Sequence, residues 1–537
     1  MPAPAAFAPL VENAVFRGLW VASLAANMAM WMHDVAAAWL MTSLTTNPAL
    51  VALVSTASAM PVFVLGIPSG ALADIVDRRR FFAVTQVWVS ITAVALVVLV
   101  ASGALSAPLL LLLTFANGMA LAMRWPVFAA VVPQVVTREH LPQALALNGI
   151  SMNLSRVAGP MVAGALLSTL GADAVFALNA AAAVLSFGLI LRWKSAPRTS
   201  TLPGERFVGA VRVGLTFALQ SPRLKVILLR IFLFFVQVSA LSSLLPLVAR
   251  GLHGGGPGTF TLMLSALGLG AIVAALMFPR WRARFDRDRF VRTGTLVHAA
   301  FTSLIVAVPE IWLALPAMFV VGMAWMSVAN SLNIAAQVAM PDWVRARGMA
   351  IYQTALMGGA TAGSLVWGQV AGWIGVNATV WAAAGFALAV LLLTRRLTVE
   401  GGRDIDFSPA TTPRPLPEPQ VPVAPDDGPV MVTIEYQVDP ARATEFAEVM
   451  QRTRRARLRQ GALSWGLFRD VAEPGRYIEY FVDETWIEHL RRLERFTAFD
   501  AELRELRMSF HTGSEPPLVR RYVGDAHMPP AEAPPVH

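Results

Sequence analysis

Long apolar stretches recur along the chain, separated by short polar breaks, from about residue 16 to residue 394. Each approaches the ~20 residues that an α-helix needs to cross a ~30 Å hydrocarbon core. The pattern predicts twelve helices, near residues 17–43, 48–74, 81–102, 108–131, 143–169, 173–192, 224–250, 259–279, 290–308, 311–337, 349–373 and 377–395. We therefore expect an all-α membrane protein with twelve transmembrane helices.

One longer insert, 193–223, divides the predicted helices six and six. Its segment GERFVGAVRVGLTFALQ is typical of an amphipathic helix that lies along a surface. The predicted divisions of the membrane part are thus an N-terminal half at 1–192, a cytoplasmic central loop at 193–223 and a C-terminal half at 224–396.

Composition supports the membrane assignment. Hydrophobic residues make up 56% of the chain and charged residues only 14%, where a soluble domain carries about 25% charged residues. The formal net charge is +9, but the basic residues stand in every second break between spans and form no continuous stripe, so we expect no nucleic-acid binding. By the positive-inside rule these breaks and both termini are cytoplasmic. In the remaining breaks, which lie on the other side of the membrane, Arg250 is the only lysine or arginine.

Metal and cofactor chemistry are not expected. The chain has no cysteine, which excludes disulfides and thiolate metal sites. We predict neither a metal nor a cofactor.

The composition changes after residue 396, where a proline-rich linker at 397–429 begins. Beyond it the pattern predicts strands and helices in the order βαββαβ, which is the ferredoxin-like α+β arrangement. These predicted elements are a strand at 431–438, a helix to about 460, strands at 463–470 and 476–482, a helix at 484–506 and a strand at 517–523. We assign 430–525 to a small cytoplasmic domain and 526–537 to a disordered tail.

Charges crowd the end of the second predicted span, in the sequence GALADIVDRRR. Gly70 and Asp74 are four residues apart, so they share one helix face and present a carboxylate where another backbone can approach closely. A carboxylate there can accept hydrogen bonds from the free amides of a neighbouring helix N-terminus. With Arg78 and Arg79, these residues are candidates for a conformational latch; alternatively, the arginines only fix the orientation of the chain.

The fifth predicted span contains a second motif, NLSRVAGPMVAG. Pro160 removes a backbone donor and kinks a helix, and the small residues Gly159 and Gly164 permit close helix packing. The alternative is ordinary local packing, since glycine and proline are frequent in membrane helices.

These two motifs and the six-plus-six arrangement resemble the major facilitator superfamily. The loop after span 2 is similar to the family pattern G-x-x-x-D-R-x-G-R-R, departing from it at Ile75 and Asp77. Span 5 resembles the exporter pattern G-x-x-x-G-P-x-x-G-G, with Ser155 and Ala163 in place of glycines. The N-terminal half resembles the secretion-effector subfamily, which includes siderophore exporters.

The resemblance implies the major facilitator fold and a function. It implies export of a small organic molecule across the bacterial inner membrane, in exchange for protons, by alternating access between the two halves. The substrate, protons and the lipid bilayer are the partners that it implies.

Ionisable residues inside the predicted spans are functional candidates, because charge at depth is costly. At ~1.5 Å of rise per residue, Asp34 lies ~25 Å and Arg156 ~20 Å from the cytoplasmic end, so the two could pair. We predict that Asp34, with His33, carries the coupled proton and that Arg156 holds its carboxylate charged. Alternatively, Asp34 is only a charge at the outer end of a tilted helix.

Other polar residues at depth are candidates for the substrate cavity. If the family layout holds, the cavity lies between the halves near the midplane. Two arginines would attract an anionic cargo, unless they are only topological charges, and the amides would contact the cargo, unless they only join helices. The candidates are Asn27, Arg124, Arg230, Gln237, Asn330 and Asn333.

The C-terminal domain leaves a second class of function open. Its pattern resembles small dimeric α+β barrels of the antibiotic-biosynthesis monooxygenase type, so the chain could be a membrane-anchored sensor or monooxygenase-like enzyme. Trp465, His489 and Arg469 would then line its pocket, although these residue types are more often packing or surface residues. We favour a non-enzymatic domain that regulates or dimerises the transporter.

Overall fold

The computed structural model describes residues 7–75, 78–137, 140–191, 207–282, 284–399, 406, 408 and 419–524. The chain forms two compact units. The first unit comprises Met1–Pro203, Val226–Ala335 and Tyr352–Glu400, and the second comprises Gly204–Lys225, Ala336–Ile351 and Gly401–His537.

Long helices make up the first unit. Among the described residues, twelve helices are between 18 and 33 residues long, and a short α1 (Ala8–Glu12) precedes them. The long helices are α2 (Ala14–Leu44), α3 (Pro48–Ile75), α4 (Arg78–Ala101), α5 (Ala107–Val135), α6 (Leu141–Thr169), α7 (Ala172–Leu191), α9 (Pro222–Gly251), α10 (Pro257–Arg282), α11 (Arg287–Ala307), α12 (Ile311–Val338), α13 (Asp342–Ile374) and α14 (Val376–Leu393).

Eight of these helices, within the described residues, contain a stretch long and apolar enough to cross a membrane. They are α3, α4, α7, α9, α10, α11, α12 and α14. Helix α2 is not among them, and it packs against α3, α5, α6 and α7. Because protein covers so much of its surface, α2 needs less apolar surface than a helix that faces lipid.

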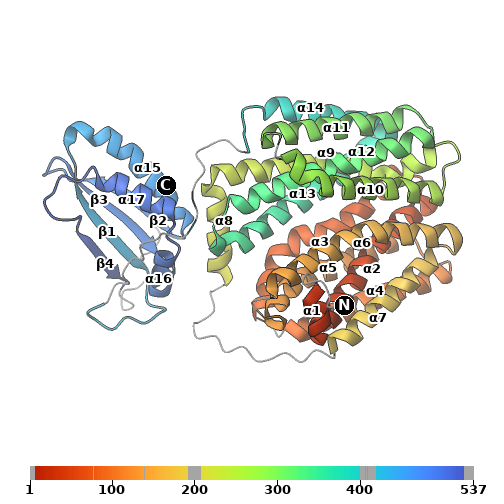
Figure 1. Cartoon of the computed structure of the whole chain (residues 1–537), viewed down its shortest axis with the longest axis horizontal. Helices are drawn as coiled ribbons and strands as arrows, with labels where there is room; N and C mark the ends of the chain where they lie inside the picture. The colour runs from red at the N-terminus through yellow and green to blue at the C-terminus, as the bar shows by residue number, and fades with distance from the viewer. Residues whose placement is uncertain are drawn as a thin grey trace, which may run out of the picture. The chain divides into compact units, whose positions relative to one another are not determined.

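The long helices gather into two bundles, α2–α7 and α9–α14 (Figure 1). Helix α6 of the first bundle packs against α10 of the second. Helix α3 meets α13, where a Cβ on Gly358 would lie 2.8 Å from the ring of Phe63. These two helix pairs therefore form part of the interface between the bundles.

Local sequence sets where several helices begin and end. Pro48, Pro222 and Pro257 are the first residues of α3, α9 and α10, where a missing amide hydrogen costs nothing. The side chain of Asn13 caps α2 by accepting a hydrogen bond from the amide of Phe16.

A four-stranded antiparallel sheet forms the centre of the second unit. Its strands lie in the order β2-β3-β1-β4, and the chain order is the expected βαββαβ except that two helices, not one, stand before the last strand. Buried side chains of β1 pack with those of α15 and α17 in one apolar core. The elements are α8 (Phe207–Gln220), β1 (Val430–Gln437), η2 (Pro440–Arg442), α15 (Ala443–Arg459), β2 (Ser464–Arg469), β3 (Arg476–Asp483), α16 (Trp486–Glu494), α17 (Ala498–Met508) and β4 (Val519–Val523).

Two sequence predictions need correction here. The single helix predicted at 484–506 is two helices, because Thr497 and Asp500 form a capping box that starts α17. The eleventh long helix was predicted to begin near 349, but it begins at Asp342. The amphipathic helix of the central insert is present as α8, and within the second unit it packs against α15.

Candidate functional site

His33 lies on the buried side of α2, inside the first bundle. Its side chain is 4% exposed, its Nε2 lies 3.4 Å from the hydroxyl of Thr114 on α5, and its ring meets the edge of Phe176 on α7. The histidine predicted to take part in coupling is therefore enclosed by helices of one half only.

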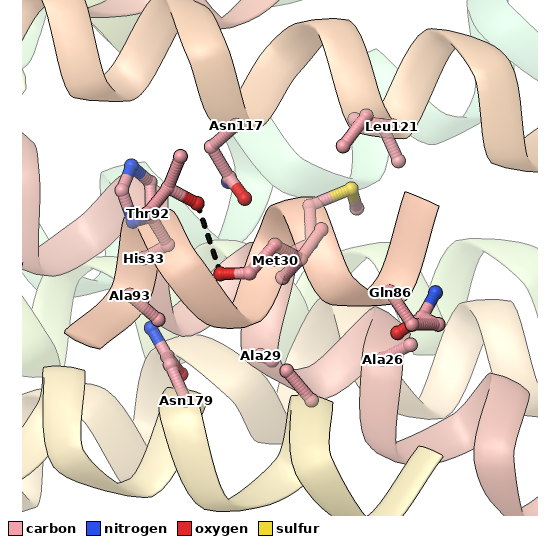
Figure 2. Close-up of a pocket in the computed structure, with 13 residues that line it drawn as sticks. Ala26, Ala29, Met30, His33, Gln86, Thr92, Ala93, Asn117, Leu121 and Asn179 are labelled. Atoms are coloured by element: carbon pink, nitrogen blue, oxygen red, sulfur yellow. Dashed lines mark hydrogen bonds between the residues drawn. The ribbon is translucent and has the colours of Figure 1, made fainter. Parts of the chain in front are cut away.

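A small cavity adjoins His33 (Figure 2). Its polar lining comes from four helices: His33 on α2, Gln86 and Thr92 on α4, Asn117 on α5 and Asn179 on α7. The amide groups of Gln86 and Asn179 are buried and have no hydrogen-bond partner within the part of the chain that the structure describes. A volume of about 30 Å³ gives room for one or two water molecules but not for an organic cargo.

Asp34 faces a different neighbour from the one expected. Ser58 on α3 donates a hydrogen bond of 2.9 Å to its Oδ1. Among the described residues Asp34 has no ion pair with Arg156, so the predicted pairing is not present in this conformation.

Arg156 on α6 instead lies between two tryptophans. Its guanidinium carbon is 5.6 Å from the ring centroid of Trp31 on α2 and 5.2 Å from that of Trp325 on α12. Its Nε is buried and has no hydrogen-bond partner among the described residues. The two indoles come from opposite bundles, so this arginine stands where the halves meet.

The glycines of α6 lie in close helix contacts. A Cβ on Gly159 would lie 2.6 Å from the Cβ of Trp31, and a Cβ on Gly164 would overlap the side chain of Thr261 on α10. Pro160 is buried within the same helix. The two glycines thus hold α6 against α2 in its own half and against α10 in the other half.

The latch candidates lie at the junction of α3 and α4. Gly70 and Asp74 belong to α3, which ends at Ile75, and Arg78 and Arg79 begin α4. The side chains of Asp74, Arg78 and Arg79 lie outside the described part of the chain.

The cavity candidates fall into separate environments. Arg230 is buried and donates hydrogen bonds to the carbonyls of Thr394 and Leu397, at 3.0 and 2.9 Å. Gln237 lies 2.8 Å from His298, from its Nε2 to the imidazole Nδ1. These contacts join α9 to α11 and to the residues that follow α14.

The other cavity candidates differ in exposure. Asn27 is buried on α2, whereas Asn330 and Asn333 on α12 are half-buried. The side chain of Arg124 lies outside the described part of the chain.

The two bundles meet at the end where α2 stops and α10 starts. Arg250, in the last turn of α9, donates a hydrogen bond of 2.7 Å to the hydroxyl of Thr42 and covers the ring of Trp39 at 4.7 Å. Trp39 also stacks on Phe260 of α10. We call Arg250, Thr42, Trp39 and Phe260 the end clasp.

In the C-terminal domain, the candidate pocket residues serve other contacts. The indole of Trp465 donates to Glu479 at 3.1 Å, and His489 lies 2.8 Å from Asp483, while Arg469 is exposed at the end of β2. Trp465 and His489 are thus tied to different carboxylates.

Glu479 is completely buried beside Arg457. Burial by itself would raise the pKa of Glu479, but the neighbouring Arg457 and Arg507 and the hydrogen bonds from Arg457 and Trp465 lower the pKa to about 2. Glu479 is therefore ionised, and it stabilises the fold through its contacts with Arg457 and Trp465.

Sequence reasoning missed several of these residues. Trp31, Trp325, Gln86 and Asn179 belong to no motif. Only the fold brings the two tryptophans to Arg156 and the two amides to the cavity beside His33. Arg250 did give a signal, because it is the basic residue that breaks the charge pattern of its loops.

Comparison with known families decides the identity of the chain. A family described as transmembrane secretion effector, of the major facilitator superfamily, matches residues 4–528. The chain belongs to this family. The match includes the C-terminal domain, and it makes this secretion effector a multi-pass membrane transporter and not an enzyme.

Three curated relatives of this chain are 20% to 26% identical to it. An uncharacterized MFS-type transporter of Bacillus subtilis is 25% identical over 65% of this chain and 84% of its own length. The enterobactin exporter of Citrobacter koseri is 26% identical over 50% of this chain, and the staphyloferrin A transporter of Staphylococcus aureus is 20% identical over 47%. The chain spans 64% and 63% of the lengths of these last two proteins.

Solved structures confirm the transporter fold. A nucleoside transporter superposes with a TM-score of 0.60 at 13% identity, covering 71% of this chain and 99% of the transporter. A bacterial homologue of the lysosomal transporter Spinster, in an inward-facing conformation, superposes with a TM-score of 0.57 at 14% identity, covering 74% of this chain and 98% of the homologue.

Proposed function

We propose that this secretion effector exports a small organic molecule across the bacterial inner membrane in exchange for protons. Its twelve long helices span the membrane as two six-helix halves, which rock about the interface made by α6 with α10 and α3 with α13. Relatives whose names describe enterobactin export and macrolide efflux support the direction of transport.

The observation that carries this proposal is the end clasp. Arg250 and Phe260 of one bundle hold Thr42 and Trp39 of the other through a hydrogen bond, a cation–π contact and stacked rings. These contacts close one end of the interface with polar and aromatic groups that a rotation of the halves would separate. Alternating access requires such a closure, which forms in one state and breaks in the other.

The charge pattern assigns the clasp to the outer face of the membrane. Basic residues concentrate in the breaks at the opposite end of the spans, which are cytoplasmic by the positive-inside rule, and both termini lie on that side. The conformation is then closed toward the outside, and cargo enters from the cytoplasm. The latch of Gly70, Asp74, Arg78 and Arg79 belongs to the opposite state, in which the inner end is closed.

Asp34 remains the proposed proton carrier, and its neighbour in the chain, His33, lines a small cavity that has room for water. A half-buried carboxylate that accepts one hydrogen bond from Ser58 has only partial stabilisation of its charge, so it can take up a proton when the surroundings change. Arg156 is free of Asp34 in this conformation and can approach it only after the helices move.

Retention of cargo by cells tests the proposal. Cells with and without the protein are loaded with enterobactin, staphyloferrin A or a macrolide, and the retained amount is measured before and after the proton gradient is collapsed. We expect lower retention of at least one cargo in cells that carry the protein, and no difference once the gradient is lost. Equal retention of every cargo in both strains would contradict export.

A further inference from the structure

Arg156 has aromatic neighbours but no acid among the described residues. The guanidinium lies 5.6 Å from the Trp31 ring and 5.2 Å from the Trp325 ring, and the carboxylate of Asp34 accepts a hydrogen bond from Ser58. The buried Nε of Arg156 and the buried indole Nε1 of Trp31 both lack hydrogen-bond partners within the described residues. These two N–H groups, one of them on a positively charged side chain, have no acceptor among the described residues.

The indole faces do not complete this arrangement. They attract the guanidinium electrostatically, but they do not provide the oxygen acceptors that its N–H groups need for hydrogen bonds. Because the arginine side chain is half-buried, its outer face can still receive a negatively charged partner.

We propose that Arg156, Trp31 and Trp325 form the binding site for the carboxylate of an organic anion, which is the cargo. The planar guanidinium fits a carboxylate with two parallel hydrogen bonds, the Nε1 of Trp31 offers a further donor, and the indole surfaces receive the apolar body of the molecule. This inference rests on the proposed export function and specifies its substrate class.

The position of the site links binding to movement of the halves. Trp31 stands on α2 and Trp325 on α12, so an anion held by Arg156 contacts both bundles. Rotation of the bundles separates the two indoles, and the cargo then loses one side of its site. The same movement that opens the outer end therefore weakens the hold on the anion and favours its release.

Ligand-dependent thermal stability of the purified full-length protein in nanodiscs tests the site without requiring transport. Benzoate and salicylate serve as anionic probes, and benzamide serves as the neutral probe of the same shape. We expect both anions to raise the melting temperature in a saturable manner and benzamide to leave it unchanged, since a ligand that binds only the folded state stabilises it.

Variants identify the residues that bind. We expect the midpoint of the benzoate titration to rise at least about tenfold in Arg156→Gln and about threefold in Trp325→Leu, in line with the loss of a charged hydrogen bond and of an aromatic contact. Arg156→Lys keeps the charge and should bind with intermediate affinity. Trp312→Leu, at an 82% exposed tryptophan of the same helix, is the matched control and should bind as the unaltered protein does.

Two results would overturn the site. One is an equal stabilisation by benzoate in Arg156→Gln and in the unaltered protein, with both proteins folded in the absence of ligand. The other is an equal stabilisation by benzamide or sulfate in place of benzoate. Either result contradicts the anion site but not the export function, provided that cells still expel a cargo. Conversely, anion binding without expulsion of any cargo would contradict the export function but not the site.

Discussion

Asp34 is the residue on which proton coupling depends in the proposed mechanism. Asp34→Asn keeps an acceptor for the hydroxyl of Ser58 but removes the group that can bind a proton. We expect gradient-driven efflux to fall by about 5- to 150-fold, the range of ordinary coupling free energies, while exchange of labelled for unlabelled cargo without a gradient continues. Transport in proteoliposomes, with and without an imposed pH difference, measures both activities.

Ser58→Ala is the control for this change, because it removes the hydrogen bond and keeps the carboxylate. It should retain gradient-driven efflux with a shifted pH dependence. Full gradient-driven efflux by Asp34→Asn would eliminate Asp34 as the proton carrier.

Glu479 has a structural role that can be separated from transport. Its pKa is lowered from 4.5 to about 2, so its contribution to stability is fully present above pH 4.5 and is lost as the pH falls toward 2. Glu479→Gln leaves Arg457 buried without its charged partner, and we expect a loss of ~3–5 kcal/mol in the free energy of unfolding of the C-terminal domain.

Limited proteolysis of the full chain detects this loss as faster cleavage within 430–523. Glu435→Gln breaks a more exposed pair with Arg476 and should change the stability by only ~0–1 kcal/mol. If both variants resist protease equally, the Glu479 pair does not stabilise the domain.

Helix α6 shows how a sequence motif becomes a helix contact. Gly164 lies against Thr261 of the other bundle, where an added methyl group has no space. Gly164→Ala should separate α6 from α10 at a cost of ~1–3 kcal/mol, the range for overpacked contacts. We expect a lower melting temperature in detergent and a shift away from the conformation with the closed end clasp.

Gly149→Ala on the same helix is the matched control, since a Cβ there would meet nothing within 4 Å. An unchanged melting temperature in Gly164→Ala would show that the two helices adjust without cost.

Elements were predicted more reliably from the sequence than the contacts between them. Apolar length and charge placement located the long helices to within a few residues, except at the start of α13, because a long apolar stretch is a local property of the chain. The split of 484–506 depended on the capping pair Thr497 and Asp500 inside an otherwise continuous amphipathic pattern.

The expected pairing of Asp34 with Arg156 used depth alone. Depth does not give the direction in which a side chain leaves its helix. Here the side chain of Asp34 points toward Ser58, whereas that of Arg156 points toward Trp31 and Trp325. The partners of a buried charge therefore could not be predicted without the packing of the helices.

At the scale of the whole molecule, the proposed mechanism assigns the end clasp the role of stabilising the state that is closed at the outer end. Arg250 is exposed, so its contact with the Trp39 ring contributes about 0.5–1 kcal/mol, and its hydrogen bond to Thr42 adds a similar amount. Arg250→Gln should shift the ratio of closed to open outer ends by roughly fivefold or more, the factor that 1–2 kcal/mol produces.

The absence of cysteine makes this shift measurable. Ala52→Cys and Ala371→Cys place thiols on two alanines of one buried cluster that belong to opposite bundles, so a short thiol cross-linker joins them when the outer end is closed. We expect a lower cross-linking yield after Arg250→Gln. His253→Gln alters a contact with Glu310 inside one bundle and should leave the yield unchanged. Because the clasp opposes opening, its loss should also speed release of cargo to the outside if opening limits the transport cycle. An unchanged cross-linking yield in Arg250→Gln would show that the apolar contacts beneath the clasp hold the halves together without it.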